Sequence, residues 1–164
     1  MAELTPFDLE GYTRRTQGRC FICRMLAGDP EYRHHVVYED DAAIAFLNKY
    51  PTLAGHTLVC PKAHLEQVTG DFTEAEYLAL QAVVRRVAEA VRQAMGAARV
   101  YVLSFGSNEA NSHVHWHVAP LPPGVPLEEQ QFVALDASRG VLALNNGEMA
   151  EIAASIRDAL TPHP

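Results

Sequence analysis

Apolar positions along this chain recur with two periods, one typical of strands and one typical of helices. Short apolar runs at residues 36–38, 42–47 and 57–60 predict three strands, separated by an acidic turn and by a loop that holds proline and glycine. Residues 100–105 and 113–119 predict two more strands. Neighbouring strands with short links favour antiparallel pairing.

The clearest helix starts near Asp71. Thr73 and Glu76 have the spacing of a capping box, which supplies hydrogen-bond partners for the first turn of a helix. Apolar residues then recur at steps of three and four, and Gly96 is a natural stop. The stripe consists of Tyr77, Leu80, Val84, Val87, Val91 and Met95. Such a stripe packs against a core or an interface.

Shorter elements are expected on either side of this helix. Residues 20–27 predict a short helix, ended by Gly28 and Pro30. Residues 148–160 predict a second amphipathic helix, whose apolar positions are Met149, Ile152, Ile156 and Leu160. Residues 1–19 show weak periodicity and are expected to form an extension.

These elements predict an α+β fold: an antiparallel meander sheet with one long helix across it, plus a C-terminal helix. The length of 164 residues suits a single core. The expected organisation is an N-terminal extension over 1–19, a central domain over 20–121, and a C-terminal extension over 122–164 that packs on the same domain.

Three histidines in alternate positions carry the strongest chemical signal. Read as a strand, residues 113–119 place His113, His115 and His117 on one face and the apolar residues between them on the other. A single histidine on a strand is usually structural, but each buried imidazole needs a polar partner, so a row of three suits catalysis or metal binding.

Composition narrows the classes of function. The net charge of −7 argues against a nucleic-acid binder, which would normally show a basic face. Apolar runs stay well short of a membrane span, and the first residues lack the pattern of a secretory signal, so the expected location is cytoplasmic with no membrane partner. Three cysteines are an odd number, which disfavours a disulfide framework.

The spacing of Cys20 and Cys23 is that of half a tetrahedral zinc site. His64 and one histidine of the row could supply the other half, which leaves His115, at the centre of the row, as the candidate nucleophile. Cys60 is expected to pack in the core. The adjacent His34 and His35 are expected to face solvent.

Two stretches of sequence resemble a known family. The run His-Val-His-Trp-His-Val-Ala at 113–119 is similar to the signature of the histidine triad nucleotide hydrolases and transferases. The stretches at 38–48 and 55–64, the second reading Gly-His-Thr-Leu-Val-Cys-Pro-Lys-Ala-His, resemble the family's N-terminal half. The resemblance covers about residues 20–121 in the right order, so the central domain resembles a histidine-triad domain.

The resemblance implies a role for each histidine. His115 would attack the α-phosphorus of a nucleoside phosphate derivative and form a covalent nucleotidyl-histidine, which water or another acceptor resolves. His117 would bind the phosphate and assist the leaving group, and His56 would join the same polar network. The family's zinc-containing branch implies a structural zinc held by Cys20, Cys23, His64 and His113.

The resemblance also implies a nucleotide site. Phe21, Ile22, Met25 and Phe46 would wall the base, and Asn48, Asn111, Ser112 and His117 would contact the rest of the nucleotide. Asn48 stands where the family commonly has an Asp that holds the ribose hydroxyls. Glu109 falls about where a Gln is expected, and a carboxylate there would repel a phosphate-rich leaving group unless it points away. A homodimer is also implied.

Two other functions stay open from the sequence. One is a nucleotide-binding sensor of the same fold with little turnover, because a fold does not fix a function. The other is a metallohydrolase with catalytic zinc on the histidine row. The leaving group and the acceptor are open as well.

Overall fold

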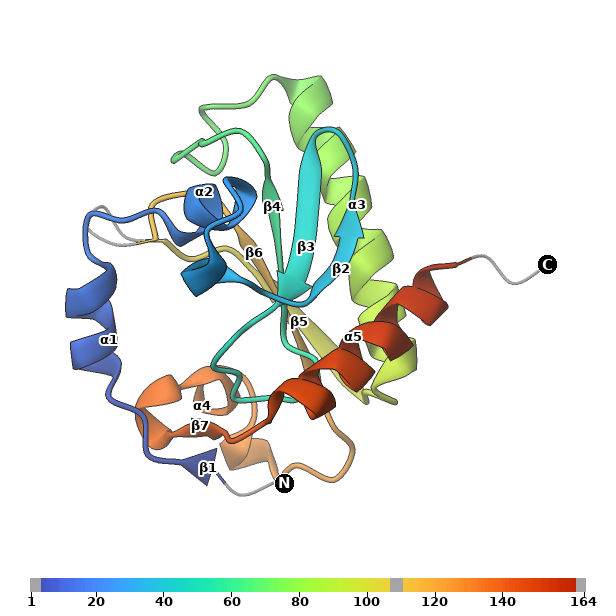
Figure 1. Ribbon diagram of the computed structural model, residues 1–164. Helices are drawn as coiled ribbons and strands as arrows, with labels where there is room; N and C mark the ends of the chain where they lie inside the picture. The colour runs from blue at the N-terminus through green and yellow to red at the C-terminus, as the bar shows by residue number, and fades with distance from the viewer. Residues whose placement is uncertain (1–3, 107–110, 162–164) are drawn as a thin grey trace.

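The computed structural model describes residues 4–106 and 111–161, which form short and long helices around a central sheet (Figure 1). The elements in chain order are β1 (Leu4–Thr5), α1 (Leu9–Thr16), α2 (Phe21–Leu26), η1 (Pro30–Tyr32), β2 (Val36–Glu39), β3 (Ala43–Leu47), β4 (Thr57–Pro61), α3 (Glu74–Ala94), β5 (Arg99–Leu103), β6 (Trp116–Leu121), η2 (Leu127–Glu129), α4 (Phe132–Leu135), η3 (Ala137–Arg139), β7 (Val141–Leu142) and α5 (Asn146–Leu160).

The central sheet has five antiparallel strands in the order β2-β3-β4-β6-β5. The α+β fold class is therefore confirmed, with the long helix and the C-terminal helix that the sequence predicts. Strands β2, β3 and β4 form a meander, whereas β6 lies between β4 and β5. This order places β6, which carries His117, at the inner part of the sheet, with a neighbour strand on each side.

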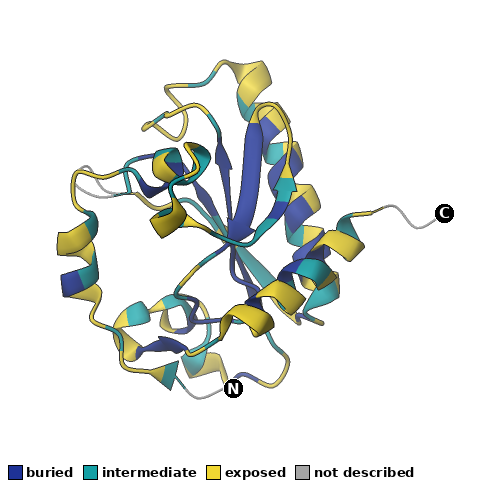
Figure 2. Ribbon diagram, in the orientation of Figure 1, coloured by how far each residue is buried: buried dark blue, intermediate teal, exposed yellow. Residues whose placement is uncertain are grey.

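Helix α3 begins with the capping box that the sequence predicts. The Thr73 hydroxyl accepts from the Glu76 backbone N–H at 3.3 Å, and the Glu76 carboxylate accepts from the Thr73 backbone N–H at 2.8 Å. The apolar stripe of α3 faces the sheet and forms the main core with β3, β4 and β6 (Figure 2). The buried residues of α3 are Leu80, Val83, Val84, Val87, Ala90 and Val91.

The C-terminal helix α5 packs beside α3 on the same face of the sheet (Figure 1). Asn145 caps its first turn, and Glu148 completes a second capping box. Met149, Ala153 and Ile156 are buried in the core that α3 shares. Residues after 122 therefore contribute directly to the main core.

The strand predicted over 113–119 begins three residues later, at Trp116. The backbone before it bonds elsewhere: the Val114 N–H donates to the Leu65 carbonyl at 2.7 Å. His113 and Val114 thus precede the sheet and lie against the segment that follows β4. The alternation of faces still holds for the apolar partners, because Val114, Trp116 and Val118 all lie in the α3 core.

Residues 4–16 form more regular structure than the sequence pattern indicates. Asp8 caps helix α1 by accepting from the Gly11 N–H at 2.9 Å, and Leu4 pairs with Leu142 in a small antiparallel sheet. The Tyr12 ring lies 5.2 Å from the Tyr50 ring. These contacts join positions far apart in sequence, so local periodicity could not reveal them.

Among residues 4–106 and 111–161, none of the helices combines the length and apolar character that a bilayer crossing requires.

The burial of α5 makes a prediction about stability. Replacing Ile156, which is fully buried, with alanine should lower the free energy of unfolding by about 2–5 kcal/mol, because it leaves a cavity between α5 and the core. Replacing the exposed Glu151 of the same helix should change it by less than about 0.5 kcal/mol. Denaturant unfolding measures both. Equal effects of the two substitutions would mean that α5 does not belong to the cooperative core.

Candidate active site and metal centre

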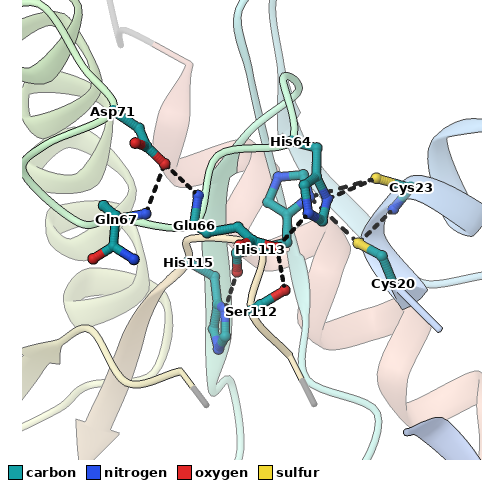
Figure 3. Close-up of polar contacts among 9 residues, drawn as sticks. All are labelled: Cys20, Cys23, His64, Glu66, Gln67, Asp71, Ser112, His113 and His115. Atoms are coloured by element: carbon teal, nitrogen blue, oxygen red, sulfur yellow. Dashed lines mark hydrogen bonds and ion pairs between the residues drawn. The ribbon is translucent and has the colours of Figure 1, made fainter. Parts of the chain in front are cut away.

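Two cysteines and two histidines meet at one end of the sheet (Figure 3). Cys20 is the N-cap of α2, Cys23 lies in its first turn, His64 follows β4, and His113 precedes β6. One ligand atom from each lies within 4.8 Å of all the others. Cys20 Sγ lies 3.4 Å from His113 Nδ1, and Cys23 Sγ lies 3.3 Å from His64 Nδ1. The structure brings together the full metal set that the sequence predicts.

The outer nitrogens of both imidazoles are held by oxygen acceptors. His113 Nε2 donates to the Pro61 carbonyl at 2.8 Å, and His64 Nε2 lies 3.1 Å from Glu66 Oε1, which also accepts from the Ser112 hydroxyl. A proton on each Nε2 leaves the Nδ1 lone pair directed at the thiols. Zinc ligands in proteins commonly have this second layer of hydrogen bonds. The residues therefore fit a tetrahedral zinc ion.

The thiols favour the same interpretation. Burial, together with the neighbouring Cys20, raises the pKa of Cys23 to about 11, so the Cys23 thiol needs a nearby cation to become thiolate at neutral pH. With four protein donors, the site is closed in the manner of structural rather than catalytic zinc. Cys60 stands apart from it, fully buried in the apolar cluster under α2, so its predicted packing role is confirmed.

His115 lies beside this cluster, and its ring orientation is fixed. Its Nδ1 donates to the His113 carbonyl at 2.7 Å, and its own carbonyl accepts from the Ser104 hydroxyl at 2.7 Å. The residue is 4 % exposed, and burial lowers the pKa of its imidazole. With Nδ1 protonated, Nε2 carries a lone pair and is free to act as a nucleophile.

His56 and His117 form a second imidazole pair. His56 Nε2 lies 3.0 Å from His117 Nδ1, and the His117 ring lies 5.0 Å from that of His115. Burial, with a smaller contribution from His115, lowers the pKa of His56 to about 4. Burial also lowers the pKa of His117 to about 3, and the two neighbouring imidazoles add to the effect. Both rings are neutral at pH 7.

The proton between them can be assigned from its surroundings. His56 Nδ1 is buried and has no hydrogen-bond partner among the described residues. Buried N–H groups are rarely left unpaired, so we place the proton on Nε2, where it is donated to His117 Nδ1. His117 then carries its own proton on Nε2. The row thus offers one lone pair, on His115, and one donor, on His117.

The predicted apolar wall forms a cluster under α2. Phe21, Ile22 and Phe46 pack together with Met25 at its border. Ile22 and Phe46 are fully buried, so Met25 and the edge of Phe21 are the parts of this set that remain accessible. The set is brought together, with three of its four members buried in the core and Met25 partly exposed.

The His34 ring, predicted to face solvent, packs against this apolar cluster. It lies 4.9 Å from Phe46 and 5.8 Å from Phe21, and burial lowers its pKa. His35 is also half-buried and contacts Asn146 at 3.1 Å, so the expectation of solvent exposure is wrong for both. Edge-on and tilted packing against rings from other elements has no signature in the local sequence.

The three polar residues predicted to contact the nucleotide, Asn48, Asn111 and Ser112, differ in their surroundings. Asn48 is tied to the active site, since its N–H donates to the His56 carbonyl at 2.8 Å while its Oδ1 accepts from the Tyr50 N–H. Asn111 has a positive φ of 56°, and its Oδ1 is buried without a partner among the described residues. The Ser112 hydroxyl points to Glu66 (Figure 3). Glu109 lies outside the described residues.

Two supporting groups were missed from the sequence. Glu66 could have been found, because it stands two residues after His64 and a carboxylate commonly orients a zinc-binding histidine. The Pro61 carbonyl could not, because its contact with His113 depends on how β4 and the segment before β6 lie together.

Known proteins are similar to this chain in sequence and in fold. The family model of the HIT domain matches residues 29–123. An uncharacterized HIT-like protein of Saccharolobus solfataricus is 33% identical over 106 residues, covering 62% of this chain and 73% of that protein. Protein hit of Bacillus subtilis is 33% identical over 105 residues, covering 62% of this chain and 70% of that protein.

Solved structures agree with these relatives. A hypothetical histidine triad nucleotide-binding protein from Sulfolobus tokodaii has a TM-score of 0.69 at 27% identity, over 86% of this chain and 91% of that chain. A Zn-bound histidine triad family protein from Mycobacterium smegmatis has a TM-score of 0.65 at 26% identity, over 87% of this chain and 93% of that chain. With its histidine row, its Cys2His2 cluster and these likenesses, the chain belongs to the HIT domain family.

Proposed function

We propose that this protein binds a nucleotide and acts as a hydrolase or nucleotidyl transferase at the α-phosphate, through a covalent intermediate on His115. The observation that carries the proposal is the hydrogen bond from His115 Nδ1 to the His113 carbonyl. It leaves Nε2 unprotonated on a ring that lies 5.0 Å from the ring of His117. A relative's description as nucleotide-binding supports the choice of ligand.

In the first step, His115 Nε2 forms a bond to the α-phosphorus, and the bond from phosphorus to the leaving group breaks. The leaving group departs with the electron pair of that bond and a proton taken from solvent, and the His115 ring gains a positive charge. The neutral His117 ring donates a hydrogen bond from Nε2 to the departing atom, and His56 stays hydrogen-bonded to the other side of the His117 ring. In the second step, water attacks the phosphorus and loses one proton to solvent, and the His115 ring becomes neutral again. The phosphorus–nitrogen bond breaks, and a nucleoside monophosphate leaves.

The nucleotide itself is proposed to lie along the apolar cluster under α2. Phe21, Met25 and His34 would contact the base, with Ile22 and Phe46 supporting them from the core. Asn48 would contact the ribose and Asn111 the phosphates, with Ser112 holding the segment beside them. A homodimer and a cytoplasmic location remain predictions.

Cys20, Cys23, His64 and His113 are proposed to hold one structural zinc ion. The ion would supply no acid–base chemistry, because all four donors are protein side chains. It would fix α2, which carries the nucleotide wall, to the residue whose carbonyl orients His115. A catalytic zinc on the whole histidine row is disfavoured, since among the described residues only His113 of the row joins the cluster.

Replacing His115 with asparagine tests the mechanism. Hydrolysis of adenosine 5′-phosphoramidate should fall by roughly 10³-fold or more, because the covalent route is lost. His117→Asn should cost about 10²- to 10³-fold, as expected for the loss of a hydrogen-bond donor to the departing atom. Mass spectrometry of the quenched wild type should find the adenylyl group on His115.

Binding of adenosine monophosphate to His115→Asn, measured by calorimetry, serves as the control for folding. An adduct on another residue, or near-normal turnover by His115→Asn, would contradict the mechanism. Tight binding by the wild type without any turnover would support the nucleotide sensor instead.

Metal analysis tests the zinc site. The purified protein should contain about one zinc per chain, and Cys23→Ser should lose most of it and melt at a lower temperature. Cys60→Ala is the matched control, because this cysteine is buried outside the cluster and its variant should keep the metal. Zinc content that is unchanged in Cys23→Ser would rule out the proposed ligand set.

The pKa of His117 predicts a dependence of stability on pH. The folded value of about 3 lies below the unfolded value of about 6.5, so acidification from pH 7 to 5 favours the unfolded state. The contribution of this residue should approach about 1.4 kcal/mol for each pH unit below 6.5. Urea unfolding at the two pH values should show a smaller loss for His117→Asn than for the wild type; an equal loss would mean that His117 is not buried as a neutral ring.

A further inference from the structure

Two aromatic side chains stack on each other at the surface beside the active site. The rings of Phe105 and Phe132 lie 6.4 Å apart with an angle of 20° between their planes. They are nevertheless 55% and 72% exposed. A stacked pair with this much open surface has apolar area available for a third planar group.

The position of Phe105 follows from the register of the sheet. Leu103, at the end of β5, pairs directly with His117 on β6, so their side chains share one face. Ser104 then bonds the His115 carbonyl at 2.7 Å. Phe105 therefore leaves the sheet immediately beside the two histidines that face the substrate.

The C-terminal segment brings Phe132 to the same place. Ala134 of α4 lies in one apolar cluster with Ala119, which stands two residues beyond His117 on β6. The Gln131 N–H donates to the Tyr101 hydroxyl at 3.1 Å, and Gln131 has a positive φ of 57°, uncommon for a residue with a side chain. This anchored turn sets the start of α4, with Ala134 inward and Phe132 outward over Phe105.

His117 lies between this aromatic pair and the nucleotide wall. On β6 it pairs with Leu58 of β4 on one side and with Leu103 of β5 on the other. Leu58 belongs to the apolar cluster under α2, where the nucleoside is proposed to bind. The aromatic pair is on the opposite side, where a group leaving the α-phosphorus would depart.

We propose that Phe105 and Phe132 form a stacking platform for a planar aromatic group carried by the leaving group. The inference rests on the proposed function and adds a specificity determinant to it: among nucleotides cleaved at the α-phosphate, the pair would favour those whose leaving group ends in a planar aromatic ring. Aromatic side chains bind such groups by stacking without reading their hydrogen-bonding pattern. Phe132 lies beyond residues 29–123, so this preference comes from the chain's own C-terminal segment.

The test uses three phosphoramidates of adenosine monophosphate: the unsubstituted one, the phenethylamide and the cyclohexylethylamide. The last two differ in whether the ring is planar. For the wild type, kcat/KM should favour the phenethylamide over the cyclohexylethylamide. Phe132→Ala should reduce this ratio about tenfold, mainly through KM, and Phe132→Tyr should retain it. Leu127→Ala is the matched control, because Leu127 is 77% exposed on the same C-terminal segment and should leave the ratio unchanged.

A ratio that is the same in Phe132→Ala and wild type, while the unsubstituted compound is hydrolysed, would overturn the platform and leave the proposed function intact. A fall of similar size in Leu127→Ala would also overturn it, since the effect would then be one of general apolar surface. A wild type that hydrolyses none of the three compounds would overturn the proposed function and the platform together.

Discussion

The contacts of His113 are the constraint on which the rest of the site depends. Its Nε2 is bound by the Pro61 carbonyl, its Nδ1 faces the thiols of α2, and its own carbonyl holds the ring of His115. A single residue therefore joins the candidate metal centre to the candidate nucleophile. Because its backbone lies outside the β6 ladder, its carbonyl is free to accept from a side chain instead of a neighbouring strand.

Burying several imidazoles together costs desolvation free energy, and hydrogen bonds made by the rings offset part of that cost. An isolated polar group in an apolar interior loses its bonds to water, whereas a chain of donors and acceptors keeps each ring neutral and oriented. His56 and His117 are joined in this way, and the unpartnered Nδ1 of His56 marks the inner end of the pair. The His115 ring lies beside them and is held by the His113 carbonyl instead. The low pKa values of His56 and His117 follow from the same burial.

Sequence alone predicted the features that depend on local spacing. The capping box of Thr73 and Glu76 and the stripe of α3 have short-range signatures. The four side chains of the candidate metal site stand in short motifs that the family resemblance brings together. The late start of β6 has no such signature, because the Val114 N–H donates to a carbonyl far away in the chain. The roles of His34 and Phe132 were missed for the same reason, since each is defined by a ring from another element.

The small sheet formed by β1 and β7 has a consequence for the order of folding. Its side-chain bond from Thr5 to Val141 spans 136 positions, so closing this loop costs more chain entropy than pairing the neighbouring strands of the central sheet. During synthesis, β1 can pair only after residues 141–142 of β7 have left the ribosome. We therefore expect the histidine row to assemble first and the segment that carries α4 to dock afterwards, so that the newly made protein passes through a state in which Phe105 has not yet met Phe132.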